Sequence, residues 1–165
     1  MRLDLMRLKS MHPLLPASTA AEYGYRAAVG LERHQHQPGV EMATLIDSEA
    51  RRAALHWVRS AAVGVEQLDR HRVTEDAAEA VALALVHTAR GWVARRRLQR
   101  GEAADWLLQD AHACLVALEV SGIDKGSDSE RLRVKLEQVR RSTVAGQRAA
   151  CVVELSTPRA TVAMA

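Results

Sequence analysis

Clustered arginines are the residues in this sequence with the clearest potential for chemistry. The 165-residue chain has 23 Lys and Arg against 20 Asp and Glu, and two of its basic stretches contain almost no acid. Guanidinium groups bind phosphate oxygens through paired hydrogen bonds, so these stretches predict an anion or nucleic-acid site. Its candidate residues are Arg95, Arg96, Arg97, Arg100, Arg140 and Arg141. In the alternative interpretation, the arginines stabilise helix C-termini and pair with acids at the starts of neighbouring helices.

Histidines form the second candidate set. His56, His87 and His112 lie on three separate segments, so folding could bring them together. Paired-metal centres in helical bundles use Glu-x-x-His on two helices, because residues three apart project together into the core. None of the seven histidines has Glu three residues before it. We therefore expect no metal site and no cofactor.

The sequence also lacks the common patterns for nucleophilic catalysis and for ion-binding loops. It contains no Gly-x-Ser-x-Gly motif, and Cys114 lies two residues after His112, a spacing that does not align side chains on a helix. The loop that starts at Asp124 has Lys135 where an EF-hand requires Glu, and it lacks the Gly-Lys-Ser/Thr of a P-loop. No catalytic residues are predicted.

Four helix-length segments between residues 44 and 149 would have to position any site. The first starts at a capping-box pattern, Thr44 to Asp47, and ends near residues 70–72. Its apolar residues recur at spacings of four and three, which is typical of an amphipathic helix. They are Ala54, Val58, Ala61, Val65 and Leu68.

The other three segments show similar signals. The second runs from Thr74 to a basic stretch closed by Gly101, and it is apolar around most of its circumference. The third extends from residue 102 to about residue 120, with Asp105 on its expected wet face. The fourth begins at a capping box over residues 127–130 and frays near Gly146. Short connections favour antiparallel neighbours, so we predict an all-α fold, an antiparallel four-helix bundle over residues 44–149.

The flanking regions look different. Residues 1–43 are expected to be a weakly ordered leader with short helices near 2–11 and 17–33, and Met42 is an alternative start of the natural protein. Residues 150–165 are expected to form a short C-terminal tail, although residues 151–155 have the composition of a strand. In such a bundle the basic ends of the second and fourth helices share one pole, so the Arg candidates should meet there.

Composition limits the functions that remain. Hydrophobic residues make up 48% and charged residues 26%, which is typical of a globular domain. The longest apolar run has seven residues, far below the roughly 20 that span a bilayer, and two cysteines are too few for a disulfide framework. We therefore expect a cytoplasmic protein that does not enter membranes.

The surplus of apolar helix surface, together with the absence of a catalytic pattern, favours a small non-catalytic interaction or regulatory protein. Its partner would be another protein or a second copy in a homodimer. The alternative is a nucleic-acid-associated regulator that binds phosphates through the Arg-rich pole. A third hypothesis is an enzyme or metal protein with a site built from His56, His87 and His112.

Overall fold

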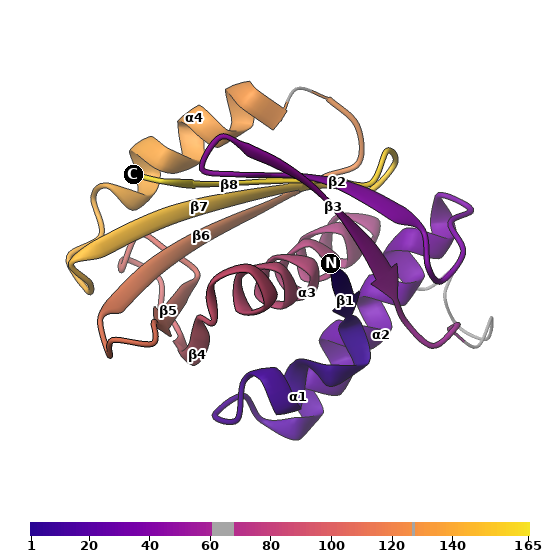
Figure 1. The fold of residues 1–165 in the computed structure, drawn as a ribbon, viewed down its shortest axis with the longest axis horizontal. Helices are drawn as coiled ribbons and strands as arrows, with labels where there is room; N and C mark the ends of the chain where they lie inside the picture. Colours follow the sequence, from indigo (N-terminus) through magenta and orange to yellow (C-terminus); the bar gives the residue numbers. More distant parts are fainter. Residues whose placement is uncertain (61–67, 127) are drawn as a thin grey trace.

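The computed structural model describes residues 1–60, 68–126 and 128–165, which form one eight-stranded sheet with helices on both faces (Figure 1). The strands are β1 (Arg2–Asp4), β2 (Glu41–Ile46), β3 (Glu49–His56), β4 (Val93–Arg97), β5 (Trp106–Gln109), β6 (Leu115–Ile123), β7 (Gln147–Glu154) and β8 (Arg159–Met164). The helices are a 3-10 turn η1 (Leu5–Arg7), α1 (Leu8–Met11), α2 (Ala17–Arg33), α3 (Arg70–Arg90) and α4 (Asp128–Val139). The predicted all-α four-helix bundle is therefore wrong, because this is a mixed α/β fold.

The strands lie in the order β1-β3-β2-β8-β7-β6-β5-β4. Strands β4, β5 and β6 form an antiparallel meander, and β6 then pairs in parallel with β7. A parallel pair needs a crossover connection, and α4 supplies it. Helices α2 and α3 lie on one side of the sheet and α4 on the other (Figure 1).

A β-hairpin replaces the first predicted helix. Burial along β2 alternates strictly, with Met42, Thr44 and Ile46 facing inward, which is the period of a strand. Asp47 and Ser48 have φ values of 45° and 73° and form the two-residue turn to β3. Positive φ at both central positions is what a type I′ hairpin turn requires. The seam of the predicted helix also used residues 61 and 65, which lie outside the described residues.

The second predicted helix is confirmed in part. Helix α3 is capped by the Asp69 side chain, and twelve of its residues between Val73 and Val86 are buried. It ends at Arg90, because Gly91 adopts a left-handed conformation with φ 69°. The predicted continuation to Arg100 is wrong, since the following residues form β4.

The third predicted helix is replaced by β5 and β6. Strand β6 is covered by α3 on one face and by α4 on the other, so most of it is buried on both faces and its burial does not alternate. A continuous run of Leu, Val and Ala fits a buried strand as well as a helix stripe. The fourth predicted helix is confirmed as α4, although it ends at Val139 rather than near Gly146. Residue 127 of the predicted capping box lies outside the described residues.

Both flanking regions contribute to the core. The helix predicted over residues 17–33 is confirmed as α2. Before it, β1 pairs in parallel with β3, and Leu3, Leu5 and Leu8 are fully buried, so this segment is not a weakly ordered leader. The expected C-terminal tail contributes β7 and β8, which lie inside the sheet. None of the helices in the described ranges has the length and apolar content needed to cross a bilayer.

Candidate functional site

A buried carboxylate, Glu79 of α3, connects the helical layer to the edge of the sheet. The Tyr23 hydroxyl and the Trp106 indole N–H each donate to Glu79 Oε2 at 2.8 Å, and Arg97 donates to Oε1 at 2.7 Å. Arg97 also donates to the Tyr23 oxygen at 2.7 Å. Burial raises the pKa of Glu79, while the Arg97 charge and the donated hydrogen bonds oppose the rise. The network fixes four side chains from α2, α3, β4 and β5, and these side chains line two hollows.

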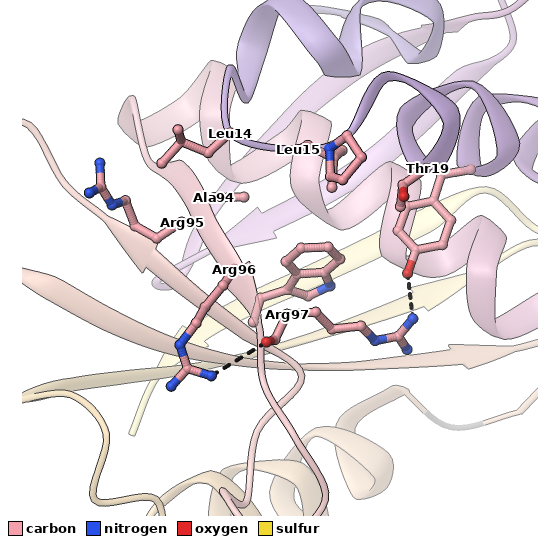
Figure 2. A pocket seen from close by; sticks show the side chains of 10 residues that line it. Leu14, Leu15, Thr19, Ala94, Arg95, Arg96 and Arg97 are labelled. Carbon is pink, nitrogen blue, oxygen red and sulfur yellow. Dashed lines mark hydrogen bonds between the residues drawn. The ribbon is translucent and has the colours of Figure 1, made fainter.

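The first hollow is an apolar groove of about 470 Å³ (Figure 2). It lies between β4, the last strand of the sheet, and the connection from α1 to α2. Leu14, Leu15 and Pro16 come from the connection, and the rings of Tyr23 and Trp106 also line the groove.

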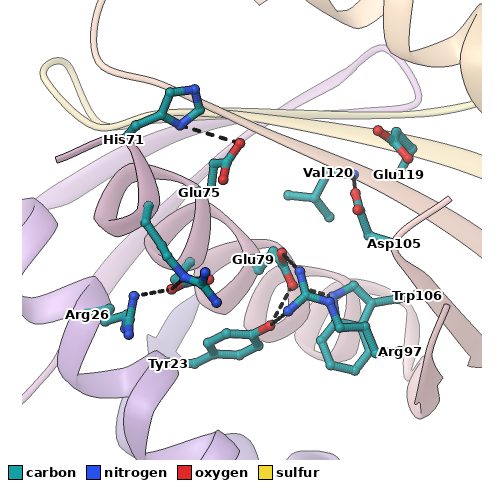
Figure 3. A network of polar contacts seen from close by, with 12 residues as sticks. Tyr23, Arg26, His71, Glu75, Glu79, Arg97, Asp105, Trp106, Glu119 and Val120 are labelled. Atoms are coloured by element: carbon teal, nitrogen blue, oxygen red, sulfur yellow. Dashed lines mark hydrogen bonds and ion pairs between the residues drawn. The ribbon is translucent and has the colours of Figure 1, made fainter. Parts of the chain in front are cut away.

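The second hollow is a polar pocket of about 250 Å³ that is lined by Glu79 and Arg97 of the network (Figure 3). Acidic and basic side chains line it in similar numbers, and they come from α3, α4, β4, β6 and the residue before β5. The acids are Glu75, Glu79, Asp105 and Glu119, and the basic groups are His71, Arg97, Arg131 and Lys135.

The pocket exists because β5 is shorter than β6. The pair Trp106 and Leu118 is the last between these two strands, so β6 continues beyond it with β7 as its only described neighbour. Asp105, directly before β5, fills the start of the gap and accepts the Val120 N–H through Oδ2 at 2.8 Å. The strand register therefore places the Asp105 carboxylate beside Glu119.

A glycine lets α3 approach this part of β6 closely. A Cβ atom added at Gly122 would lie 2.5 Å from the Thr74 carbonyl oxygen and 3.0 Å from the Ala78 Cβ. No side chain fits there, and the close approach brings Glu75 and Glu79 of α3 to the wall of the pocket.

Asp105 and Glu119 form a pair of opposed carboxyl groups. Glu119 is 2% exposed, and Lys135 Nζ donates to its Oε1 at 2.5 Å. Its Oε2 is buried and receives no hydrogen bond from the described residues. The Asp105 carboxylate lies within hydrogen-bonding reach, but two ionised carboxylates cannot bond to each other. Burial and repulsion from Asp105 raise the pKa of Glu119 to about 7, and Lys135 limits the rise.

Such a pair can be stabilised in two ways, by a shared proton or by a cation. Magnesium is commonly held by one or two carboxylates, with waters and substrate phosphate oxygens completing its shell. Across residues 1–60, 68–126 and 128–165, no three His, Cys, Asp or Glu side chains are grouped to hold a metal. The Asp105 and Glu119 pair, with one buried oxygen that lacks a donor, therefore fits a magnesium-type site in which the protein supplies two ligands.

The predicted arginine site is distributed over three places. Arg95, Arg96 and Arg97 lie on β4, Arg100 follows in the loop to β5, and Arg140 and Arg141 follow the end of α4. Arg96 makes two hydrogen bonds to Glu102, at 2.7 and 3.0 Å. The Ser142 hydroxyl donates to the Glu102 carbonyl at 2.6 Å, so the loop that carries Arg100 contacts the segment after α4. The two basic stretches thus approach each other through a strand and a loop, and anion binding by them stays a prediction.

The histidines occupy separate environments. His87 packs edge-on against His12, with ring centroids 5.4 Å apart, whereas His112 is exposed in the turn between β5 and β6. His56 is the last residue of β3. His12 is fully buried, and its Nδ1 accepts the Ala94 N–H at 3.0 Å. Burial, with a smaller effect of His87, lowers the pKa of His12 to about 4, so the ring is neutral near pH 7.

Of the predicted arginines, Arg97 lines the polar pocket, but sequence reasoning missed the acids of the pocket and Lys135. The sequence predicts Asp105 on the wet face of a helix, and it singles out Lys135 only as a mismatch to an EF-hand loop. One signal was present: Glu119 is the single acid within the apolar run from Leu115 to Val120. A lone acid in a buried strand needs a partner or a ligand, and it is a candidate for function.

Comparison with known proteins adds no further assignment. No protein-family model matches the chain, no curated protein matches its sequence, and no solved structure matches its fold.

Proposed function

We propose that the protein is a divalent-cation-dependent hydrolase of phosphate esters, with its active site in the polar pocket. The observation that carries the proposal is the opposed pair of Asp105 and Glu119, with a buried Glu119 oxygen that has no donor and Lys135 on the other oxygen. A carboxylate pair beside a lysine and arginines suits a ligand that combines a cation with a phosphate.

Asp105 and Glu119 are the residues that would hold the cation. When bound, a divalent cation supplies positive charge that stabilises a phosphoryl transition state and acidifies water. Cation binding requires both carboxylates to be ionised, so it competes with the proton on Glu119. Apparent affinity should rise with pH up to about 7, the pKa of Glu119.

Two basic side chains, Lys135 and Arg131, line the same pocket and can contact phosphate oxygens. In the proposed reaction a water oxygen forms a bond to phosphorus and the ester P–O bond breaks. The leaving oxygen keeps the electron pair of that bond and takes up a proton. Nucleic acid is the proposed polyanionic substrate, because the basic stretches of β4 and of the segment after α4 approach each other near this end of the sheet.

Cation binding is the first test. We expect isothermal titration with Mn²⁺ or Mg²⁺ to show one site that is lost in Asp105→Asn and in Glu119→Gln. The matched control is Glu137→Gln on α4, an exposed acid paired with Arg133 outside the pocket, which should bind the cation normally. Equal binding by the native protein and both pocket variants would contradict the site.

Hydrolysis is the second test. Bis(p-nitrophenyl) phosphate and a supercoiled plasmid should be cleaved with Mn²⁺ or Mg²⁺, and cleavage should fall at least about 100-fold in Glu119→Gln and in Lys135→Ala. If the cation binds but neither substrate is cleaved, the site is a binding site and the hydrolase proposal fails.

The non-catalytic interaction protein is the second candidate function, with a protein partner or a second copy as its ligand. The apolar groove beside the edge strand β4 favours it, because an open edge can accept another strand. A cytoplasmic location belongs to both proposals. Its support is that Cys114 and Cys151 are both free thiols.

A further inference from the structure

The apolar groove lies beside β4, an outer strand of the sheet that carries the consecutive arginines of residues 95–97. We infer that this groove binds an extended acidic segment of a partner protein, whose backbone pairs with β4 and whose apolar side chains enter the groove. The inference is independent of the proposed hydrolase function, because Arg97 is the one residue that lines both the groove and the polar pocket in the described part of the chain.

Strand β4 offers an open edge for such pairing. It is the last strand of the sheet, and β5 is its only strand partner in the described part of the chain. Near its start, the Ala94 N–H is occupied by His12. From Arg95 to Arg97 the strand borders the groove instead. An extended peptide can add to such an edge through main-chain hydrogen bonds and place alternate side chains in a pocket.

The groove has the size and lining of a pocket for apolar side chains. Its volume of about 470 Å³ falls within the range of ligand pockets, roughly 300–1,000 Å³. Leu15, Tyr23 and Trp106 are at most 4% exposed and line it, while Leu14 is 54% exposed at its border. The Arg97, Tyr23 and Glu79 contacts hold this lining in place (Figures 2 and 3).

The positive charge beside the groove favours an acidic partner segment. The Arg95 side chain has no acid partner among the described residues, and Figure 2 shows the Arg95 and Arg96 side chains directed away from the apolar lining. A second copy paired edge to edge through β4 would bring these arginines against each other. An acidic strand avoids the repulsion and can form an ion pair with Arg95, while Arg96 and Arg97 already contact Glu102 and Glu79.

A synthetic peptide can test the inference. The probe is a fluorescein-labelled peptide of five Leu-Asp repeats, titrated with the full-length protein and followed by fluorescence anisotropy. We expect saturable binding that weakens about tenfold or more in Arg95→Glu. The matched control is Arg100→Glu, which makes the same charge change in the following loop, outside the groove lining, and should bind like the native protein.

Two further peptides separate the parts of the inference. A Leu-Lys repeat peptide should not bind, and equal binding by it would overturn the acidic specificity. A Leu-Asp peptide with alternate backbone nitrogens methylated should lose binding, and retained affinity would rule out strand pairing. Absence of any binding, or a dimer in sedimentation that Arg95→Glu dissociates, would refute the acidic partner segment.

Discussion

At the scale of single residues, the structure concentrates unusual electrostatics at Glu119. The acid lies on a strand covered by helices on both faces, and its nearest charged neighbours are Asp105 and Lys135. Burial of an ionised carboxylate is unfavourable, and a second carboxylate makes it more so. A group in this environment lowers the stability of the folded chain unless a proton or cation compensates, which is why we place the proposed function there.

The pH dependence of stability follows from this environment. The pKa of Glu119 is raised from 4.5 to about 7, so the folded state holds a proton that the unfolded state has released. Between about pH 4.5 and 7 this group lowers the free energy of unfolding as pH rises. His12 has the opposite pH dependence. Its pKa is lowered from 6.5 to about 4, so between these values the unfolded state binds a proton that the folded state does not, and stability falls as pH falls. The variant Glu119→Gln isolates the first effect.

We compare the urea midpoint of Glu119→Gln with that of the native protein at pH 5 and at pH 8. The midpoint of the variant minus that of the native protein should be larger at pH 8. Tryptophan fluorescence can follow unfolding without added divalent cations. The effect of His12 is common to both proteins and cancels in the difference. A midpoint difference that is the same at both pH values would show that Glu119 ionises normally.

The Tyr23 hydroxyl can be tested against a neighbour on the same helix. Tyr23→Phe removes a donor to the buried Glu79 and an acceptor for Arg97, and the loss of the buried bond leads us to expect a loss of about 1–3 kcal/mol in unfolding free energy. Tyr25→Phe is the control, since Tyr25 is 38% exposed, and its effect should stay within about 0.5 kcal/mol. Equal losses in urea denaturation would contradict the network.

At the scale of elements, the pocket results from a mismatch of strand lengths and from one close contact. Strand β5 pairs with β6 only up to Leu118, which leaves the following residues of β6 open on that side. Helix α3 then approaches β6 at Gly122. The side chains of the pocket come from elements distant in sequence, and these two features bring them together.

Replacement of Gly122 should therefore disturb both the fold and the pocket. Gly122→Ala places a methyl group against the Thr74 carbonyl, so we expect a cost of about 1–3 kcal/mol and weaker cation binding. Gly146→Ala is the control, because no atom lies within 4 Å of its added Cβ. Chemical denaturation and Mn²⁺ titration of both variants measure the two effects. If Gly122→Ala has the stability and the Mn²⁺ affinity of the native protein, the close contact of α3 with β6 at Gly122 is not required.

At the scale of the whole molecule, the chain folds around its N-terminal segment. Strand β1 extends the sheet beside β3, and the residues after it pack under α2 and α3. His12 of this segment accepts a hydrogen bond from β4 and contacts the Leu83 carbonyl of α3 at 3.3 Å. The segment therefore joins the two ends of the sheet to the helical layer.

Neighbouring residues in this segment should differ sharply in effect. Leu5 is fully buried, so Leu5→Ala should cost about 2–5 kcal/mol in unfolding free energy. Met6 is 49% exposed, and Met6→Ala should cost less than about 1 kcal/mol. Thermal and urea unfolding can compare them; similar small losses would mean that the segment contributes little to the core.

Local signals in the sequence predicted several helices correctly. Helix α2 has the predicted residues, α4 begins at the predicted acidic start, and α3 covers much of the segment predicted to be apolar around most of its circumference. The predicted second helix instead runs past Gly91, where α3 ends. These features depend on residues within a few turns of each other, which is why a single segment can reveal them.

The sequence by itself determined these helices, the composition of a folded domain and the positions of its charges. Only the tertiary structure decided that two predicted helices are pairs of strands, and that Asp105, Glu119, Lys135 and Glu79 share one pocket. The physical reason is that strand pairing is non-local. When a strand is buried on both faces, as β6 is, its sequence loses the alternation that would distinguish it from a helix.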